Sequence, residues 1–311
     1  MKYWRRPLIV GASGQVGTAL MEAFARREIA QRVMRSSREA RQGWLRLDLE
    51  ELADLGSGPA LLDEMTPDLI LCTGGMTFVD GCESDENASR KANALGPATL
   101  ARYARRVGAA FVFFSTDYVF PGSAEAPGPY EETSATAPLS VYGRTKLEGE
   151  QAVMEAHSGA LVIRTTVVYG PEPAGKNFLY TLLRYPSQGQ RVRVAADQVS
   201  TPTYNRDLAE ATLALVGVGA SGVVHVAGPE QMDRLQFARE VAGDFGLRED
   251  LIDGVTTASL GQKAARPLQS GLVTRRLEEL LPAFRRHTVR EALAECGSEL
   301  QRFMDTLPRQ L

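Results

Sequence analysis

Hydrophobic and polar positions alternate with two different periods along the first half of the chain. Short, nearly continuous apolar runs predict buried strands, and longer segments with apolar residues at helical spacing predict helices. The predicted strands are residues 8–10, 31–35, 44–48, 69–72, 110–114, 161–163 and 223–226. The predicted helices are residues 16–27, 87–106, 141–156, 207–216, 234–245 and most of 274–307. This pattern is typical of an α/β fold, a doubly wound (Rossmann) parallel sheet with helices on both faces.

The alternation weakens after the strand predicted at residues 161–163, which indicates a smaller C-terminal substrate-binding domain that is partly interleaved with the first. The predicted NAD(P)-binding Rossmann domain comprises residues 1–166 and 188–228, and the predicted substrate-binding domain comprises residues 167–187 and 229–311. Residues 121–138 are rich in Pro, Gly, Ala, Ser and Glu. A loop of this length inside a compact domain is usually functional or disordered.

Composition narrows the class of protein. Of 311 residues, 44% are hydrophobic and 23% charged, which is ordinary for a soluble globular protein. The net charge of -3 argues against nucleic acid as a partner. No apolar run approaches the roughly 18 residues of a membrane span, and residues 1–7 contain no signal-type apolar core. Cys72, Cys82 and Cys296 form no close pair, so we expect a reducing cytoplasm and no disulfide scaffold.

A glycine-rich segment lies between the first predicted strand and the first predicted helix. Its pattern, GxxGxxG over residues 11–17, allows a sharp turn and a close approach of the backbone to a diphosphate at a helix N-terminus. A glycine turn without a ligand is the alternative, and the position between strand and helix favours a dinucleotide. The candidate cofactor-binding residues here are Gly11, Ser13, Gly14, Gln15, Val16 and Gly17.

The second predicted strand is followed by basic and hydroxyl side chains rather than by the acid that an NAD site favours. Arg35, Ser36 and Arg38 suit a 2′-phosphate, so we predict NADPH as the cofactor, with NADH as the alternative. Two solvated arginines are the other interpretation of this segment. Asp48 is a candidate partner of the adenine amino group, although a plain strand-end carboxylate explains it equally well.

Tyr142 and Lys146 lie four residues apart, so a helix places them on one face. A nearby ammonium group lowers the pKa of a phenol, which can then give a proton to a carbonyl oxygen as hydride arrives at the carbon. Ser115 and Thr116 end an apolar strand, where ligands of doubly wound sheets bind. Either hydroxyl could orient a substrate carbonyl, and capping of the strand end is the alternative.

These motifs together resemble the extended short-chain dehydrogenase/reductase family, and within it the dTDP-4-dehydrorhamnose reductases. The resemblance runs through most of the chain. It rests on GASGQVG at 11–17, FSTDYVF at 114–120, PLSVYGRTKLEGE at 138–150, VYG at 168–170, KNF at 176–178 and RP at 266–267.

The resemblance implies NAD(P)H-dependent reduction of the 4-keto group of a dTDP-linked 6-deoxysugar, the last step toward an activated L-rhamnose donor. It implies a catalytic trio of Thr116, Tyr142 and Lys146, with Lys146 also holding the nicotinamide ribose. It places further cofactor contacts at Leu49, Thr73 and Gly74. Its substrate contacts fall at Ser115, Asp117, Tyr118, Val167, Asn177, Gln198 and Arg266.

Three departures from the family pattern concern the substrate and the cofactor end. Val167 stands where the family carries a tryptophan, Cys72-Thr73-Gly74-Gly75 stands in place of Asn-Ala-Ala-Ala, and Pro121 replaces an aspartate. Loss of an aromatic contact is worth about 1 kcal/mol or more. A reductase or epimerase on a different keto-sugar is therefore one alternative.

A second alternative is a non-catalytic NADP-binding subunit similar to the regulatory subunit of methionine adenosyltransferase. The intact trio argues against it. His157, His225 and His287 are isolated from one another, so we expect no metal site, and no serine elbow supports a hydrolase. We expect no membrane partner, and a homodimer is open as the assembly state.

Overall fold

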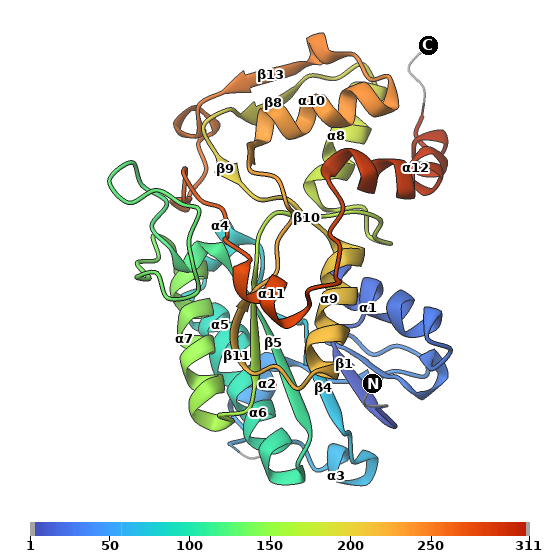
Figure 1. Cartoon of the computed structure of the whole chain (residues 1–311), viewed down its shortest axis with the longest axis vertical. Helices are drawn as coiled ribbons and strands as arrows, with labels where there is room; N and C mark the ends of the chain where they lie inside the picture. The colour runs from blue at the N-terminus through green and yellow to red at the C-terminus, as the bar shows by residue number, and fades with distance from the viewer. Residues whose placement is uncertain (1–3, 57, 309–311) are drawn as a thin grey trace.

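A seven-stranded parallel sheet lies in the lower half of the molecule as viewed in Figure 1, in a computed structural model that describes residues 4–56 and 58–308. Residues 1–3 of the predicted Rossmann domain and residues 309–311 of the predicted substrate-binding domain lie outside this range, as does residue 57. The strand order is β11-β6-β5-β4-β1-β2-β3, and every neighbouring pair is parallel. The strands are β1 (Pro7–Val10), β2 (Met34–Ser37), β3 (Leu45–Arg46), β4 (Leu69–Cys72), β5 (Ala110–Thr116), β6 (Leu161–Thr165) and β11 (Gly222–His225).

Helices cover both faces of this sheet, because its strands carry apolar side chains on both sides. Ile9 packs with one buried cluster, whereas Leu8 and Val10 pack with another. The first cluster is closed by α1 (Gln15–Arg26), α9 (Asn205–Gly217) and α11 (Arg275–Leu280). The second is closed by α2 (Leu49–Ala53), α3 (Leu61–Met65), α6 (Gly96–Val107) and α7 (Val141–Ala156). The predicted fold class is confirmed.

A third apolar cluster lies at the opposite end of the molecule (Figure 1). It contains side chains of α8 (Phe178–Ser187), α10 (Arg234–Phe245), α12 (Val289–Asp305) and β8 (Val192–Ala195). The small strands around it are β7 (Val168–Tyr169), β9 (Val199–Ser200), β10 (Thr203–Tyr204), β12 (Met232–Asp233) and β13 (Ile252–Val255).

The pairing of β8 differs from the predicted division of the chain, which assigns residues 188–228 to the Rossmann domain. β8 pairs with β13, because Val192 and Val194 are buried against Phe237 and Val241 of α10 rather than against the large sheet. β11, by contrast, joins the large sheet beside β6. Across the described residues, the helices are all too short or too polar to cross a membrane.

Two predicted strands differ from the structure in their bounds. Residues 30–32 form a 3-10 turn, and the second strand runs instead over β2, in register with β1 through the pairs Leu8–Met34 and Val10–Ser36. The third strand shortens to β3 because the Asp48 carboxylate accepts a hydrogen bond from the Glu50 amide and caps α2. This role as a helix cap agrees with the second alternative for Asp48, a carboxylate at the end of a strand.

Two predicted helices are also interrupted. The segment predicted at 87–106 contains α5 (Glu86–Arg90), a π turn over Lys91–Leu95 and then α6. A Cβ at Gly96 would lie 2.1 Å from the Leu49 carbonyl oxygen, so only glycine allows α2 to approach this closely. The segment predicted at 274–307 is interrupted between α11 and α12, where Thr288 and Glu291 form a capping box.

Candidate active site

The glycine turn joins β1 to α1 at the point where the strand order reverses, between β1 and β4. Gly11 has a φ of 85°, and Gly14 caps α1 without any side-chain hydrogen bond. A Cβ at Gly17 would lie 2.5 Å from the Gly11 carbonyl oxygen, and a Cβ at Gly11 would lie 2.7 Å from the Gly74 amide nitrogen. The turn therefore brings bare backbone and an uncapped helix N-terminus to one surface, as a diphosphate requires.

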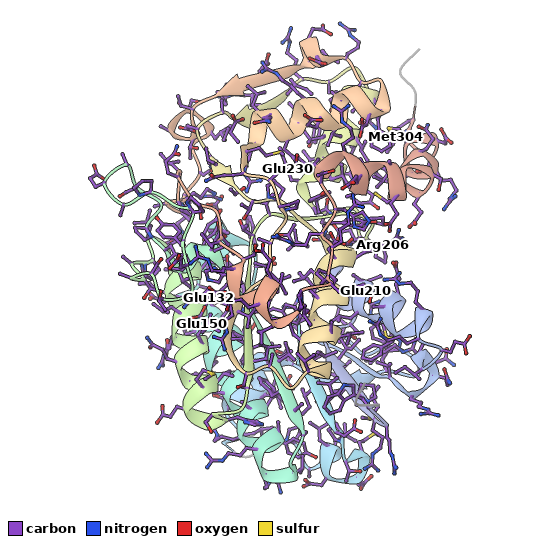
Figure 2. The ribbon with its side chains drawn as sticks, viewed as in Figure 1. Glu132, Glu150, Arg206, Glu210, Glu230 and Met304 are labelled. Carbon is purple, nitrogen blue, oxygen red and sulfur yellow. The ribbon has the colours of Figure 1, made fainter. Side chains whose placement is uncertain are left out.

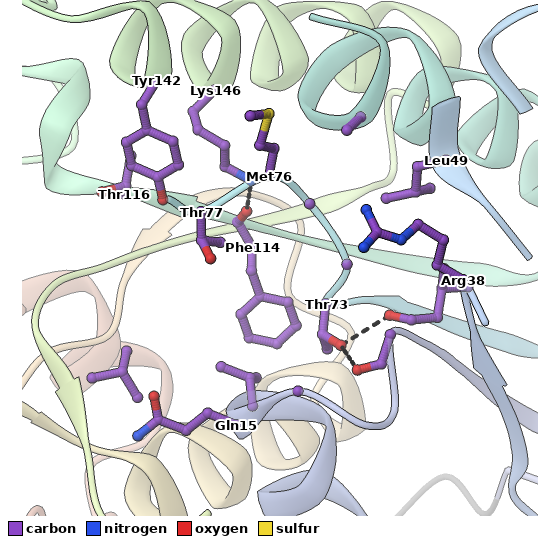
Figure 3. A pocket seen from close by; sticks show the side chains of 18 of the residues that line it. Gln15, Arg38, Leu49, Thr73, Met76, Thr77, Phe114, Thr116, Tyr142 and Lys146 are labelled. Atoms are coloured by element: carbon purple, nitrogen blue, oxygen red, sulfur yellow. Dashed lines mark hydrogen bonds between the residues drawn. The ribbon is translucent and has the colours of Figure 1, made fainter. Parts of the chain in front are cut away.

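A cleft of about 890 Å³ begins at this turn and continues along the carboxyl ends of the strands (Figure 3). Most of the candidate cofactor residues line it: Gly11, Ser13, Gly14, Gln15, Val16, Arg38, Asp48, Leu49, Thr73, Gly74, Tyr142 and Lys146. The Thr73 hydroxyl donates to the carbonyl oxygens of Val10 and Gly11, at 2.9 and 3.1 Å. It thus links the end of β4 to the glycine turn.

Basic side chains line one end of the cleft, but not all of those expected. Arg38 and Arg41 line it, whereas Arg35 does not. The guanidinium groups of Arg35 and Arg41 both lie over the Trp44 ring, 5.1 and 5.4 Å from its centroid. Ser36 is fully buried. Period-2 alternation separates the side chains of adjacent β2 residues, and Ser37 rather than Ser36 reaches the cleft. The sequence motifs did not point to Arg41, although it follows Arg38 by only three residues.

Tyr142 and Lys146 lie one helical turn apart on α7, and both line the cleft (Figure 3). The Ser140 hydroxyl caps this helix by accepting a hydrogen bond from the Gly143 amide at 3.2 Å. The Lys146 ammonium donates to the Phe114 carbonyl oxygen and lies 4.1 Å from the centroid of the Phe113 ring. Helical spacing therefore places the phenol and the ammonium as the sequence predicts.

Burial governs the protonation of both groups. It raises the pKa of Tyr142, and the hydroxyl of Thr116 opposes that rise. Burial lowers the pKa of Lys146 to about 8, and the Glu150 carboxylate opposes the lowering. At neutral pH the phenol is therefore protonated and the lysine is largely charged, which suits a proton donor beside a cation.

The two hydroxyls at the end of β5 have different partners. Ser115 lines the cleft, but its hydroxyl donates to the carboxylate of Glu150, which does not line it, at 2.5 Å. Thr116 donates to the Asp117 carboxylate at 3.3 Å and accepts from the Tyr118 amide at 3.2 Å. Figure 3 shows Thr116 beside the ring of Tyr142. Of the two candidates, Thr116 is the one near the phenol.

The predicted substrate residues divide into two groups. Ser115, Asp117, Tyr118 and Val167 line the cleft. Asn177, Gln198 and Arg266 do not line it. Asn177 donates to the Gly170 carbonyl oxygen, Gln198 bonds to Thr257 and to Arg234 at the edge of the cleft, and Arg266 pairs with Asp80 at 3.0 Å.

Sequence patterns did not identify several residues that complete the cleft, namely Met76, Thr77 and Arg234, and Lys176 was part of the KNF motif without being named as a contact. Lys176 and Arg234 bring positive charge to it from the C-terminal part of the chain. Val167 has a φ of 39°, which is an outlier for a β-branched residue. Backbone strain of this kind is concentrated at functional sites.

Comparison with known proteins gives consistent similarities. A family described as the RmlD substrate binding domain matches residues 5–302. A dTDP-4-dehydrorhamnose reductase of Mycobacterium tuberculosis (strain ATCC 25618 / H37Rv) is 37% identical over 273 residues, covering 87% of this chain and 85% of the relative. A dTDP-4-dehydrorhamnose reductase structure from Clostridium acetobutylicum is similar with a TM-score of 0.83 and 30% identity, covering 95% of this chain and 99% of that one. One from Bacillus anthracis, in complex with NADP, has a TM-score of 0.83 and 29% identity, covering 96% and 100%.

Proposed function

Since this chain belongs to the RmlD substrate binding domain family, we propose that it reduces the 4-keto group of a dTDP-linked 6-deoxysugar with NADPH, completing an activated L-rhamnose donor. It is a nicotinamide-dependent oxidoreductase. The observation that carries the proposal is the grouping of Thr116, Tyr142 and Lys146 in the cleft that begins at the glycine turn. One cleft thus joins a dinucleotide cradle to a proton donor.

The residues at the cradle fit the cofactor. A side chain at Gly11 or Gly17 would collide with backbone atoms of Gly74 or Gly11, so only glycine allows this tight turn, and the first turn of α1 has no side-chain cap. The pyrophosphate would lie on this turn, and Arg38 with Arg41 would hold the 2′-phosphate at the basic end of the cleft. When bound, the reduced nicotinamide supplies the hydride that reduces the carbonyl carbon.

In the proposed mechanism, a side chain of this protein donates the proton that the carbonyl oxygen needs. Tyr142 gives its hydroxyl proton to the carbonyl oxygen, so the ketone gains a proton from the enzyme and becomes an alcohol. The Lys146 charge, one helical turn away, would stabilise the phenolate that is left. Thr116 would donate a hydrogen bond that orients the same oxygen.

Two cations in the cleft support a nucleoside diphosphate sugar as the substrate class. Arg234 is the first residue of α10, and its Nε donates to the Gln198 side chain at 2.8 Å. Its guanidinium also lies 5.2 Å from the centroid of the Phe178 ring. Lys176 lines the same cleft and is exposed. We assign these two cations to the diphosphate, because a fixed guanidinium recognises phosphate oxygens well.

The test is NADPH oxidation, followed by absorbance, with dTDP-4-dehydro-6-deoxy-L-mannose. We expect oxidation that depends on this sugar, and no oxidation with dTDP-glucose, which has no keto group. The 4-keto sugar without its nucleotide should be reduced far more slowly, because it lacks the diphosphate. NADPH binding without oxidation of any 4-keto sugar would contradict the reductase and favour a non-catalytic subunit.

The proposal extends to location and assembly. Cys72, Cys82 and Cys296 are free and buried, which supports a reducing cytoplasm. We propose a homodimer as the assembly state, to be measured by light scattering on the purified full chain. A mass of one chain at assay concentration would contradict it.

A further inference from the structure

A buried ion pair lies behind the proposed catalytic group. Glu150 of α7 and Arg164 of β6 have side chains that are 4% and 5% exposed. The contact is bidentate, with Nε to Oε1 at 2.9 Å and Nη2 to Oε2 at 2.6 Å. Burying two charges costs several kcal/mol per ion unless pairing and hydrogen bonds compensate, so such a pair is weak evidence for stability alone. The proposed proton transfer does not use it.

The position of Glu150 connects this pair to the catalytic lysine. Tyr142, Lys146 and Glu150 follow one another at intervals of four residues, so they lie on one face of α7. Lys146 donates to the Phe114 carbonyl oxygen, and Ser115 donates to Glu150. Two successive residues on that face of the helix therefore bind two successive residues of β5. The next residue of the strand is Thr116.

Arg164 connects the same carboxylate to the rest of the sheet. It is the register partner of Ser115 across β5 and β6. It also donates to the Glu132 carbonyl oxygen at 3.3 Å, and the Glu132 carboxylate accepts from the His225 amide at 2.9 Å. Figure 2 shows Glu132 and Glu150 close together beside α7. The pair thus joins α7, β5, β6, β11 and the 121–138 loop.

We propose that Glu150 is a positioning residue for this reaction, which fixes the end of β5 against α7 and keeps the positive charge on Lys146. The catalytic role of Glu150 rests on the proposed function, whereas its contacts with Ser115 and Arg164 do not depend on that function. Arg164 holds the carboxylate in place. The ammonium is otherwise surrounded by groups that cannot supply a permanent negative charge.

The groups around Lys146 can be named element by element. β4 presents the Cys72 thiol and α4 (Val79–Cys82) presents the Cys82 thiol. Burial raises the pKa of both thiols, the first to about 12, so both are neutral at pH 7. β5 contributes a carbonyl oxygen, and α7 itself contributes Tyr142 and Glu150. α5 and the π turn place two neutral side chains, Ser89 and Asn93, against Thr145 of α7. The charged contacts between α5 and α7, Arg90 with Glu148 and Glu86 with Arg144, lie at the surface.

The direct test is a titration of Lys146 in protein labelled with [ε-13C]lysine. The chain has five lysines, and the signal that is lost in Lys146→Met assigns the one of interest. We expect Glu150→Gln to lower the titration midpoint of Lys146 by about one pH unit, because a nearby opposite charge is removed. Glu148→Gln is the matched control, since this carboxylate pairs with Arg90 at the surface, and it should leave the midpoint unchanged.

An unchanged or raised midpoint in Glu150→Gln would overturn the proposal. If that variant does not fold, Glu150→Gln with Arg164→Gln keeps a hydrogen-bonded pair without either charge. In this double variant we expect a smaller downward shift of the Lys146 midpoint, because the positive charge of Arg164 is lost together with the negative charge of Glu150, which lies one helical turn from Lys146. No shift would again overturn the proposal. In the reductase assay, the alkaline limb of the kcat profile should move to lower pH in Glu150→Gln, with little change in the KM for NADPH.

This design separates the two proposals. The titration needs no substrate, so a lowered midpoint in a protein that reduces no keto-sugar would support the positioning role while contradicting the function. Sugar reduction by a Glu150→Gln variant whose lysine midpoint and pH profile match the wild type would contradict the positioning role alone.

Discussion

The ring of Tyr118 packs edge-on against the ring of Tyr142, with centroids 5.5 Å apart and ring planes at 76°. This geometry is a favourable arrangement for two aromatic rings. Tyr118 follows Thr116 by two residues, so the same short segment supplies both the ring that packs on the phenol and the hydroxyl beside it. The orientation of Tyr142 is therefore set before any substrate binds.

The first prediction concerns the proton donor. Tyr142→Phe keeps the packed ring and removes only the hydroxyl, so kcat should fall by about 10²- to 10⁴-fold while the Kd for NADPH is unchanged. Tyr185→Phe, at an exposed position on α8, is the control and should retain wild-type kcat. Steady-state kinetics and fluorescence titration with NADPH measure the two quantities. Wild-type kcat in Tyr142→Phe would remove this residue from the mechanism.

The second prediction concerns the glycine turn. Gly17→Ala places a Cβ 2.5 Å from the Gly11 carbonyl oxygen and 2.6 Å from the Ala12 Cα, so the turn must open. We expect the Kd for NADPH to rise by at least about tenfold, a loss of about 1.4 kcal/mol. Gly297→Ala in α12 meets no atom within 4 Å and should leave that Kd unchanged while stabilising the helix by about 1 kcal/mol. Equal affinities in both variants would refute the cradle.

The third prediction concerns the choice between NADPH and NADH. Arg38 and Arg41 line the basic end of the cleft, so replacing both with alanine should raise the KM for NADPH and leave the KM for NADH nearly unchanged. Arg32→Ala is the control, because that exposed residue does not line the cleft. A parallel rise in both KM values would show that the arginines do not read the 2′-phosphate.

The fourth prediction concerns acid stability. Burial, helped by the charge of Arg164, lowers the pKa of His225 to about 3, whereas an unfolded histidine titrates near 6.5. The unfolded chain therefore binds this proton first, and stability present above pH 6.5 is lost as the pH falls toward 3. Between pH 7.5 and 5.0, His225→Leu should lose about 2 kcal/mol less unfolding free energy than the wild type. Urea unfolding at the two pH values measures this, and equal losses would contradict the assignment.

Local pattern predicted the parts of the site that lie close together in sequence. The bounds of α7 agree with prediction, and the four-residue spacing alone placed Tyr142 and Lys146 on one face. The glycine turn was likewise visible between β1 and α1. The bounds of β2 were wrong by about three residues, because its register depends on pairing with β1 rather than on its own weak apolar pattern.

Residues that reach the cleft from distant segments could not be predicted in this way. Arg234 follows Tyr142 by 92 positions and enters the cleft only because β12 pairs with β9 and sets the start of α10. Asn177, Gln198 and Arg266 came from the family resemblance, yet none of them lines the cleft, and Gln198 meets it only through its hydrogen bond with Arg234. A single sequence does not reveal whether a polar side chain is already hydrogen-bonded to a residue from a distant segment.

The most direct test of the central claim is the fate of the hydride itself. NADPH carrying deuterium at the transferred position would be incubated with enzyme and dTDP-4-dehydro-6-deoxy-L-mannose, and the sugar product examined by mass spectrometry and NMR. We predict one deuterium at C4 of the sugar for each NADPH oxidised. A sugar product without deuterium at C4, or one formed with no net oxidation of NADPH, would contradict it, the latter as an epimerase would behave.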